Sequence, residues 1–297
     1  MSIGSAQPVL RFAPSPNGEL HLGHALSALF GYRMARRLRG RFLLRIEDID
    51  IGRCRPEHVS GIFRDLRWLG VEWEEPVIRQ SECMPVYAAA AAKLTAMGLL
   101  YPCFATRAEI SSAAAGGPLD PDGAPVYPGL HRDLPVAEVV RRKTAGQPFA
   151  MRLNMKKALT VLQAKLSGRA LTFGQFDLDG GVSRIAADPE RWGDVILQRK
   201  DVPTSYHLAV VVDDARQGIT HVTRGQDLLA ATDIQRLLQV LLDLPEPVYR
   251  HHPLITDASG RKLAKSARDQ SLRELREAGA TPDDVIEMVQ EVCTLPS

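Results

Sequence analysis

The sequence lacks long hydrophobic runs, a disulfide pattern and an excess of positive charge. Its longest apolar stretches, such as LAVVV at 208–212, are far too short to cross a bilayer. The N-terminus, MSIGSAQPVL, has no basic region followed by an apolar core, so we expect no signal peptide, no membrane association and a cytoplasmic protein. The few cysteines are scattered without a disulfide-like framework: Cys54, Cys83, Cys103 and Cys293. With a net charge of +2, any nucleic-acid binding must be local.

What is present is the composition of a soluble globular protein, 45% hydrophobic and 24% charged. VLRFAP at 9–14 predicts a buried strand, the stretch from Leu22 to Gly40 predicts a helix, and RFLLRIEDID at 41–50 predicts a second strand. This order is that of a βαβ unit, which implies a parallel sheet with a right-handed crossover.

Further along the chain, helices are expected at 56–69, 85–98 and 226–242, and the sheet pattern returns at 194–199 and 205–214. The polar stretch 111–125 is typical of a flexible surface loop. We therefore predict an α/β fold, a doubly wound (Rossmann-type) parallel sheet split by an insertion and followed by a short helical C-terminal segment. The expected divisions are 1–100 and 191–260 for the two halves of the split domain, 101–190 for the insertion, and 261–297 for the tail.

The stretch RFAPSPNGELHLGH at 11–24 crowds prolines, glycines and histidines before the first helix. A helix N-terminus offers unpaired N–H groups and a positive dipole end to phosphate. Gly18 and Gly23 permit close approach of a ligand, and His21 and His24 would share one helix face. The alternative is two ordinary surface histidines beside a strand-to-helix turn.

Near the other end, KLAKS at 262–266 follows the glycine turn ASGR. A mobile loop that carries Lys262 and Lys265 can close over a triphosphate and neutralise its charge. A solvated basic loop is the alternative interpretation.

These two motifs, together with LRIEDID at 44–50 and SYHLAVVVDDARQGITHVTRGQDLL at 205–229, resemble the glutamyl branch of the class I aminoacyl-tRNA synthetases. The resemblance implies ATP with Mg²⁺ as substrate and His21, His24, Lys262 and Lys265 as catalytic residues. It also implies two sets of binding residues. The ATP site comprises Gly18, His21, Gly23, His24 and Lys265. The glutamate site comprises Arg11, Ala13, Ser15, Glu47, Tyr206 and Arg224.

For three of these residues a structural role remains an alternative. Arg11 and Glu47 stand on neighbouring strands and could form a cross-strand ion pair, and Tyr206 could simply pack in the core. We therefore leave both interpretations open for these positions.

Only residues 267–297 follow the KLAKS motif, too few for an anticodon-binding domain. In this respect the chain resembles the bacterial glutamyl-queuosine tRNA(Asp) synthetases, which attach L-glutamate to queuosine at the wobble position of tRNA(Asp). Two alternatives are a minimal glutamyl-tRNA synthetase that charges the 3′ end and a catalytically inactive RNA-binding paralogue. The oligomeric state cannot be derived from the sequence, and monomer is the default.

In this family the insertion often holds zinc through a Cys-x-Cys pair and a Tyr-x₃-Cys pair. This chain keeps Cys103 and Tyr127 but has Ala105 and His131 at the other two positions. Structural zinc usually has four ligands, so Cys103, Tyr127 and His131 form an incomplete set. We expect the zinc to be lost and replaced by packing; a site completed by solvent is the alternative.

Five arginines crowd the end of the first predicted helix: Arg33, Arg36, Arg37, Arg39 and Arg41. Such a cluster could follow RNA phosphates. A solvated helix end is an equally good interpretation.

Overall fold

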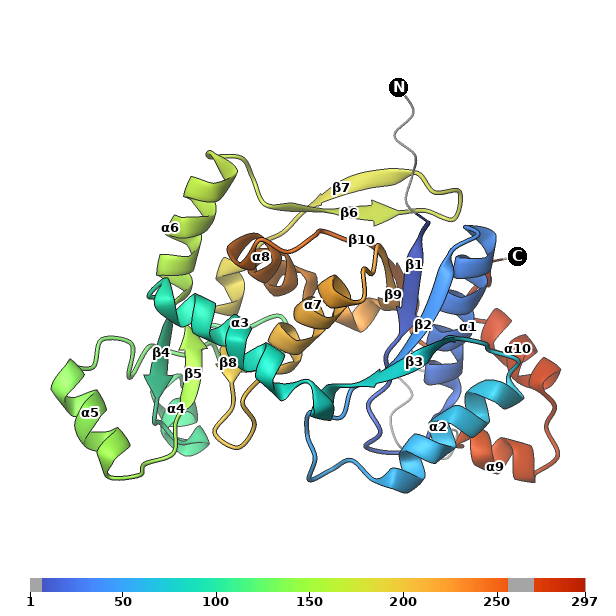
Figure 1. The fold of residues 1–297 in the computed structure, drawn as a ribbon, viewed down its shortest axis with the longest axis horizontal. Helices are drawn as coiled ribbons and strands as arrows, with labels where there is room; N and C mark the ends of the chain where they lie inside the picture. Colours follow the sequence, from blue (N-terminus) through green and yellow to red (C-terminus); the bar gives the residue numbers. More distant parts are fainter. Residues whose placement is uncertain (1–6, 256–269, 297) are drawn as a thin grey trace.

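The chain begins with the βαβ unit that the sequence predicts. The structure, a computed structural model, describes residues 7–255 and 270–296. Strand β1 (Val9–Phe12) leads into helix α1 (Leu22–Arg37), and β2 (Arg41–Ile46) returns parallel to β1. Helix α2 (Pro56–Trp68) then leads to β3 (Glu74–Arg79), which pairs with β2 in parallel (Figure 1).

Along β1 and β2, successive side chains point to opposite faces of the sheet, so apolar and charged side chains lie on different faces. Leu10 and Leu44 are buried in one hydrophobic cluster with residues of α1. Because successive side chains of a strand point to opposite faces, Arg11 and Arg45 belong to the other face, which α7 (Tyr206–Arg216) covers. The sheet is thus apolar on its α1 side and charged on its α7 side.

A second sheet extends the first at β1. Its strands, in spatial order, are β7 (Val182–Ala186), β6 (Thr172–Phe176), β10 (Val248–His252) and β9 (His221–Gly225). Apart from the antiparallel β6–β7 hairpin, neighbouring strands in this sheet are parallel. Just before β9, the Thr220 N–H donates to the Val9 carbonyl at 3.0 Å, so β9 follows β1 in space although most of the chain separates them.

A small antiparallel sheet forms a separate lobe, at the left of Figure 1. Its strands are β4 (Leu100–Cys103), β5 (Ala150–Leu153) and β8 (Ile196–Gln198). The helices between them are α4 (Arg107–Ala113), α5 (Val136–Thr144) and α6 (Met155–Leu166). The β6–β7 hairpin lies within the expected insertion 101–190, yet it pairs with β10. The proposed domain division remains a prediction.

The remaining helices complete the two layers around the sheets. They are α3 (Met84–Ala96), α8 (Thr232–Leu242), α9 (Leu272–Glu277) and α10 (Pro282–Gln290), with 3-10 turns at Gln80–Glu82, Glu190–Trp192 and Gln226–Leu228. Helices α9 and α10 are the two short helices expected at the C-terminal end. In the part of the chain that the structure describes, no helix is both long and apolar enough to span a bilayer.

Two expectations about secondary structure are wrong. The run 205–214, expected to belong to the sheet, forms most of α7. This helix is buried on nearly all sides between α3 and α8, so its apolar residues show no helical periodicity and resemble a core strand. The helix expected at 226–242 is interrupted, since a 3-10 turn ends at Leu228 and α8 begins only at Thr232.

Candidate active site

A cavity of about 510 Å³ opens at the carboxyl ends of the parallel strands. It lies between β1 and β9, two strands that are neighbours in space but far apart in the sequence. Open α/β sheets bind ligands at such a crevice. The predicted residues that line it are Arg11, Ala13, Ser15, His21, Gly23, His24, Glu47, Tyr206 and Arg224. Gly18 does not line it. Lys262 and Lys265 lie outside the described residues.

The two histidines cap the N-terminus of α1. His21 is the N-cap, and its Nδ1 accepts the Gly23 N–H at 3.1 Å, while Nδ1 of His24 accepts the His21 N–H at 3.2 Å. The ring centroids are 3.9 Å apart. Because Nδ1 accepts in both rings, a neutral imidazole carries its proton on Nε2. Each ring therefore offers an N–H donor at a helix end that already favours anions.

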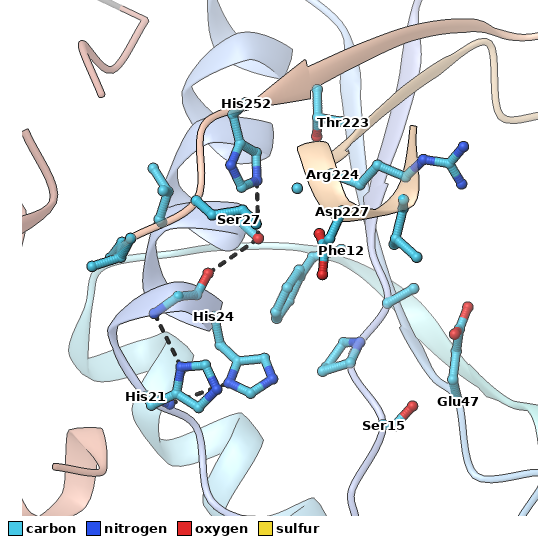
Figure 2. Close-up of a pocket in the computed structure, with 18 of the residues that line it drawn as sticks. Phe12, Ser15, His21, His24, Ser27, Glu47, Thr223, Arg224, Asp227 and His252 are labelled. Atoms are coloured by element: carbon cyan, nitrogen blue, oxygen red, sulfur yellow. Dashed lines mark hydrogen bonds between the residues drawn. The ribbon is translucent and has the colours of Figure 1, made fainter. Parts of the chain in front are cut away.

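The cavity wall beside α1 includes residues that the sequence analysis missed. Ser27 Oγ lies 3.0 Å from His252 Nε2 and donates to the Gly23 carbonyl at 3.1 Å (Figure 2). Thr223 and Asp227 also line the cavity. His252 ends β10, so the rule that ligands bind at the carboxyl ends of parallel strands could have identified it.

Figure 2 places Glu47 on the side of the cavity opposite His21 and His24. Arg11 and Glu47 both line the cavity, but they do not pair with each other as the cross-strand alternative supposes. Arg11 binds Asp214 with two N–H donors, each 3.1 Å from a carboxylate oxygen, and Glu47 accepts from Arg45 at 3.1 Å. Burial raises the pKa of Glu47, although Arg45 and Arg11 act in the opposite direction.

Arg224 is held from several sides. Its Nη2 donates to Thr232 Oγ1 at 2.7 Å, its Nη1 to Gln235 Oε1 at 2.8 Å, and its Nε to His251 Nε2 at 3.1 Å. The guanidinium also lies 5.2 Å from the centre of the Tyr249 ring. A guanidinium fixed in this way is pre-organised to bind a carboxylate.

Tyr206 is the first residue of α7 and lines the cavity. The residue thus lines the cavity and also packs against the main hydrophobic cluster. Burial raises the pKa of the phenol, with a smaller opposing effect of Arg224, so the hydroxyl remains a hydrogen-bond donor at neutral pH.

The three residues of the incomplete zinc set, Cys103, Tyr127 and His131, lie together and are joined by hydrogen bonds. His131 Nδ1 accepts the backbone N–H groups of Phe104 and Ala105, both at 3.1 Å. The Tyr127 hydroxyl accepts the His131 N–H at 2.9 Å and the Cys103 thiol at 3.3 Å. These groups already satisfy one another, so the arrangement does not fit a tetrahedral zinc site.

Lys200 completes this cluster from the neighbouring loop. Its Nζ donates to the carbonyls of Phe104 and Ala105, both at 3.1 Å. The turn after β4 is thus held through its N–H groups by His131 and through its carbonyls by Lys200. Among the residues with described positions, no group of three or more His, Cys, Asp and Glu is arranged to hold a metal ion.

Three of the clustered arginines near the end of α1 have partners within the chain. Arg37 pairs with Asp179 at 3.0 Å and Arg41 with Glu74 at 2.6 Å. Arg36 donates to the Tyr32 hydroxyl at 3.3 Å. An RNA-binding role of this cluster stays a prediction.

A Rossmann-type sheet with an anion-binding helix end and an arginine-lined cavity at its carboxyl edge defines a nucleotide-binding α/β protein. The family described as tRNA synthetases class I (E and Q), catalytic domain, matches residues 8–294. The chain belongs to this family, and the resemblance predicted from its motifs is confirmed.

Relatives and solved structures agree with this assignment. The chain is 46% identical to a "Glutamyl-Q tRNA(Asp) synthetase" of Rhodobacter capsulatus, over 95% of this chain and 99% of the relative. It is 37% identical to a "Glutamate--tRNA ligase" of Parasynechococcus marenigrum, over 93% of this chain and 56% of the relative. A crystal structure of glutamate-tRNA synthetase from Elizabethkingia anophelis superimposes with a TM-score of 0.75 at 26% identity, over 96% of this chain and 61% of that one.

Proposed function

We propose that the protein activates L-glutamate with ATP and transfers it to queuosine at the wobble position of tRNA(Asp). The observation that carries this proposal is the 46% identity to a Glutamyl-Q tRNA(Asp) synthetase over nearly the whole length of both chains. Three further relatives with the same name are 40–41% identical over more than nine-tenths of this chain. We further propose a cytoplasmic monomer.

In the first step, a carboxylate oxygen of glutamate attacks the α-phosphorus of ATP. A mixed anhydride, glutamyl-adenylate, forms and pyrophosphate leaves. No protein nucleophile is required, so positioning and charge stabilisation supply the catalysis. His21 and His24 would donate from Nε2 to phosphate oxygens at the N-terminus of α1. Bound Mg²⁺ would neutralise phosphate charge. We propose that Lys262 and Lys265 also neutralise phosphate charge; both lie outside the residues that the structure describes.

The glutamate would occupy the opposite side of the cavity. Glutamate carries two carboxylates and one ammonium group, so its pocket requires cations and an anion. Arg11 and Arg224 supply guanidinium groups for carboxylates, Glu47 supplies the anion for the ammonium group, and Tyr206 supplies a hydroxyl. Ala13 and Ser15 lie in the segment after β1 and also line the cavity.

In the second step, a hydroxyl of the cyclopentene diol of queuosine attacks the activated carbonyl. An ester forms, AMP leaves as the anhydride breaks, and the hydroxyl proton is lost to solvent.

A second candidate is charging of the tRNA 3′ end. The similarity to glutamate–tRNA ligases supports it, since the chemistry of the first step is the same. However, this chain spans only about three-fifths of the solved glutamyl-tRNA synthetases and 56% of those ligases.

Transfer of labelled glutamate to two bulk tRNA pools, one with queuosine and one without, separates these candidates. We expect label only in the queuosine pool, and we expect it to survive periodate oxidation of the 3′ end before the reaction when the queuosine diol is protected. Label in both pools that is abolished by 3′ oxidation would instead establish ordinary charging. No label and no glutamate-dependent pyrophosphate exchange would indicate an inactive paralogue.

A further inference from the structure

A layer of buried charges lies behind the cavity, between the sheet and α7. Arg45 and Asp213 are completely buried, and Asp214 is 6% exposed. None of the three lines the cavity. Burying charged groups is costly unless each is paired, so their partners indicate what this layer does.

The partners connect the layer to the cavity. The Asp214 carboxylate accepts from Nε and Nη2 of Arg11, both at 3.1 Å, and from Nη1 of Arg45 at 2.8 Å. Nη2 of Arg45 in turn donates to Glu47 Oε1 at 3.1 Å, and its Nη1 also donates to Gln217 Oε1 at 2.8 Å. Arg11 and Glu47, which line the cavity, are therefore joined through two residues that do not.

The register of the sheet explains why these side chains meet. Arg11 lies opposite Leu43 in the β1–β2 pair. Since side chains alternate along a strand, Arg45 and Glu47 project to the same face as Leu43 and Arg11. Helix α7 covers this face and supplies Asp214 from its last turn.

The charges in this layer support one another. Burial alone would lower the pKa of Arg45, but Asp214, Glu47 and Asp213 outweigh burial and raise it. The Asp214 carboxyl has a lowered pKa despite its burial, because Arg11 and Arg45 favour its ionised form. Asp214 and Arg45 therefore stay charged.

We propose that Asp214 and Arg45 are positioning residues for glutamate, Asp214 by orienting the guanidinium of Arg11 and Arg45 by orienting the carboxylate of Glu47. The inference rests on the proposed function, because it supposes that the cavity binds glutamate. The bonds to Asp214 use Nε and Nη2 of Arg11, which leaves Nη1 for a ligand in the cavity. The bond from Arg45 fixes one oxygen of Glu47 and leaves the other for an ammonium group.

A purely structural role accounts less well for this layer. Replacing buried ion pairs by apolar residues of similar volume is often neutral or stabilising, so stability alone does not require a charged layer in the core. Orienting two charged ligand-binding groups, by contrast, requires charged partners such as those in this layer.

The test is steady-state ATP–pyrophosphate exchange with the full chain and with Asp214→Asn, which keeps the shape of the side chain and removes its charge. We expect the KM for glutamate to rise about tenfold or more, because a buried charged partner of a binding group is lost. The KM for ATP should change less than about twofold. Asp65→Asn is the matched control, since Asp65 is a buried carboxylate paired with Arg276 at 2.6 Å outside the cavity. It should leave both KM values unchanged.

Circular dichroism shows whether Asp214→Asn folds. If it does not fold, the same kinetic measurement is made on Arg45→Lys. It keeps a positive charge in the layer but cannot bridge Asp214 and Glu47, so the KM for glutamate should again rise selectively. A glutamate KM close to that of the unaltered chain in a folded variant overturns the inference, as does loss of folding in both variants. If the unaltered chain shows no exchange, the proposed function itself fails.

Discussion

At the scale of single residues, the two histidines of the HLGH motif combine two roles in one geometry. Their Nδ1 atoms cap α1 through backbone N–H groups, and this bonding determines the tautomer that places a donor on Nε2. The cap that stabilises the helix thus also prepares the donors that a phosphate would meet.

Replacing His24 by alanine tests the proposed role of these donors. We expect the kcat of pyrophosphate exchange to fall about a hundredfold, because one donor to the developing charge is removed. The KM for glutamate should change little, since Glu47, Arg11 and Arg224 remain. The control is His58→Ala, because His58 lies outside the cavity. Equal kcat values for the His24 variant and the unaltered chain would exclude the proposed role.

The sequence was informative about residues whose role follows from local chemistry. The capping histidines and the arginines of the cavity stand in motifs, and nine of the predicted ligand-binding residues line the cavity. The pairing of Arg45 with Asp214 could not be predicted, because Asp214 is far away along the chain and meets Arg45 only through the packing of α7. Gly18 was expected at the ligand because it is a glycine in the motif, yet it does not line the cavity.

At the scale of elements, hydrogen bonds from two side chains hold the turn after β4. His131 accepts the two backbone N–H groups of the turn, and Lys200 donates to its two carbonyls. The turn and the loop that carries His131 are therefore joined by hydrogen bonds.

This arrangement predicts that chelators do not affect folding. Incubation with EDTA should leave the midpoint of thermal unfolding unchanged, and the purified protein should contain less than about one-tenth of an equivalent of zinc. A chelator-dependent drop in the midpoint would contradict the prediction.

The same geometry predicts that a zinc site can be created. The double variant Ala105→Cys with His131→Cys would place two more thiols beside Cys103 and Tyr127. We expect this variant to bind about one zinc ion and to become sensitive to EDTA, as measured by metal analysis and thermal unfolding. His131→Ala, which removes the hydrogen bonds without adding thiols, is the control and should destabilise the fold without binding zinc.

The elements themselves were predicted where polar and apolar residues follow a clear period or the ends carry clear signals. Polar and apolar residues alternate along β1 and β2, and sequence signals mark the ends of α1 and α2. The sequence predicted all four elements. Helix α7 was mistaken for a strand because it is buried on nearly every side, so that neither period is visible in its sequence.

At the scale of the whole molecule, the buried histidines contribute to how stability depends on pH. Burial, together with the positive charge of Arg224, lowers the pKa of His207 to about 4 and that of His251 to about 3. Unfolded, these histidines would titrate near pH 6.5. Between about pH 6.5 and the folded pKa values, the unfolded chain binds more protons, so acid favours unfolding.

We therefore expect the free energy of unfolding to decrease below about pH 6.5, by on the order of 1 kcal/mol per pH unit for each such histidine. Urea unfolding at pH 7.5, 6.0 and 5.0 measures this slope. His207→Gln should flatten it, because one titrating group is removed. A slope that is the same in this variant would show that His207 does not contribute.

The β6–β7 hairpin has a practical consequence for anyone who wishes to shorten this protein. Excision of residues 101–190 would remove β6 from the side of β10 and expose a row of unpaired backbone N–H and C=O groups. An unprotected edge of this kind recruits other chains and promotes aggregation. A minimal soluble version should therefore keep both strands of the hairpin and be trimmed only within the lobe formed by β4, β5 and β8.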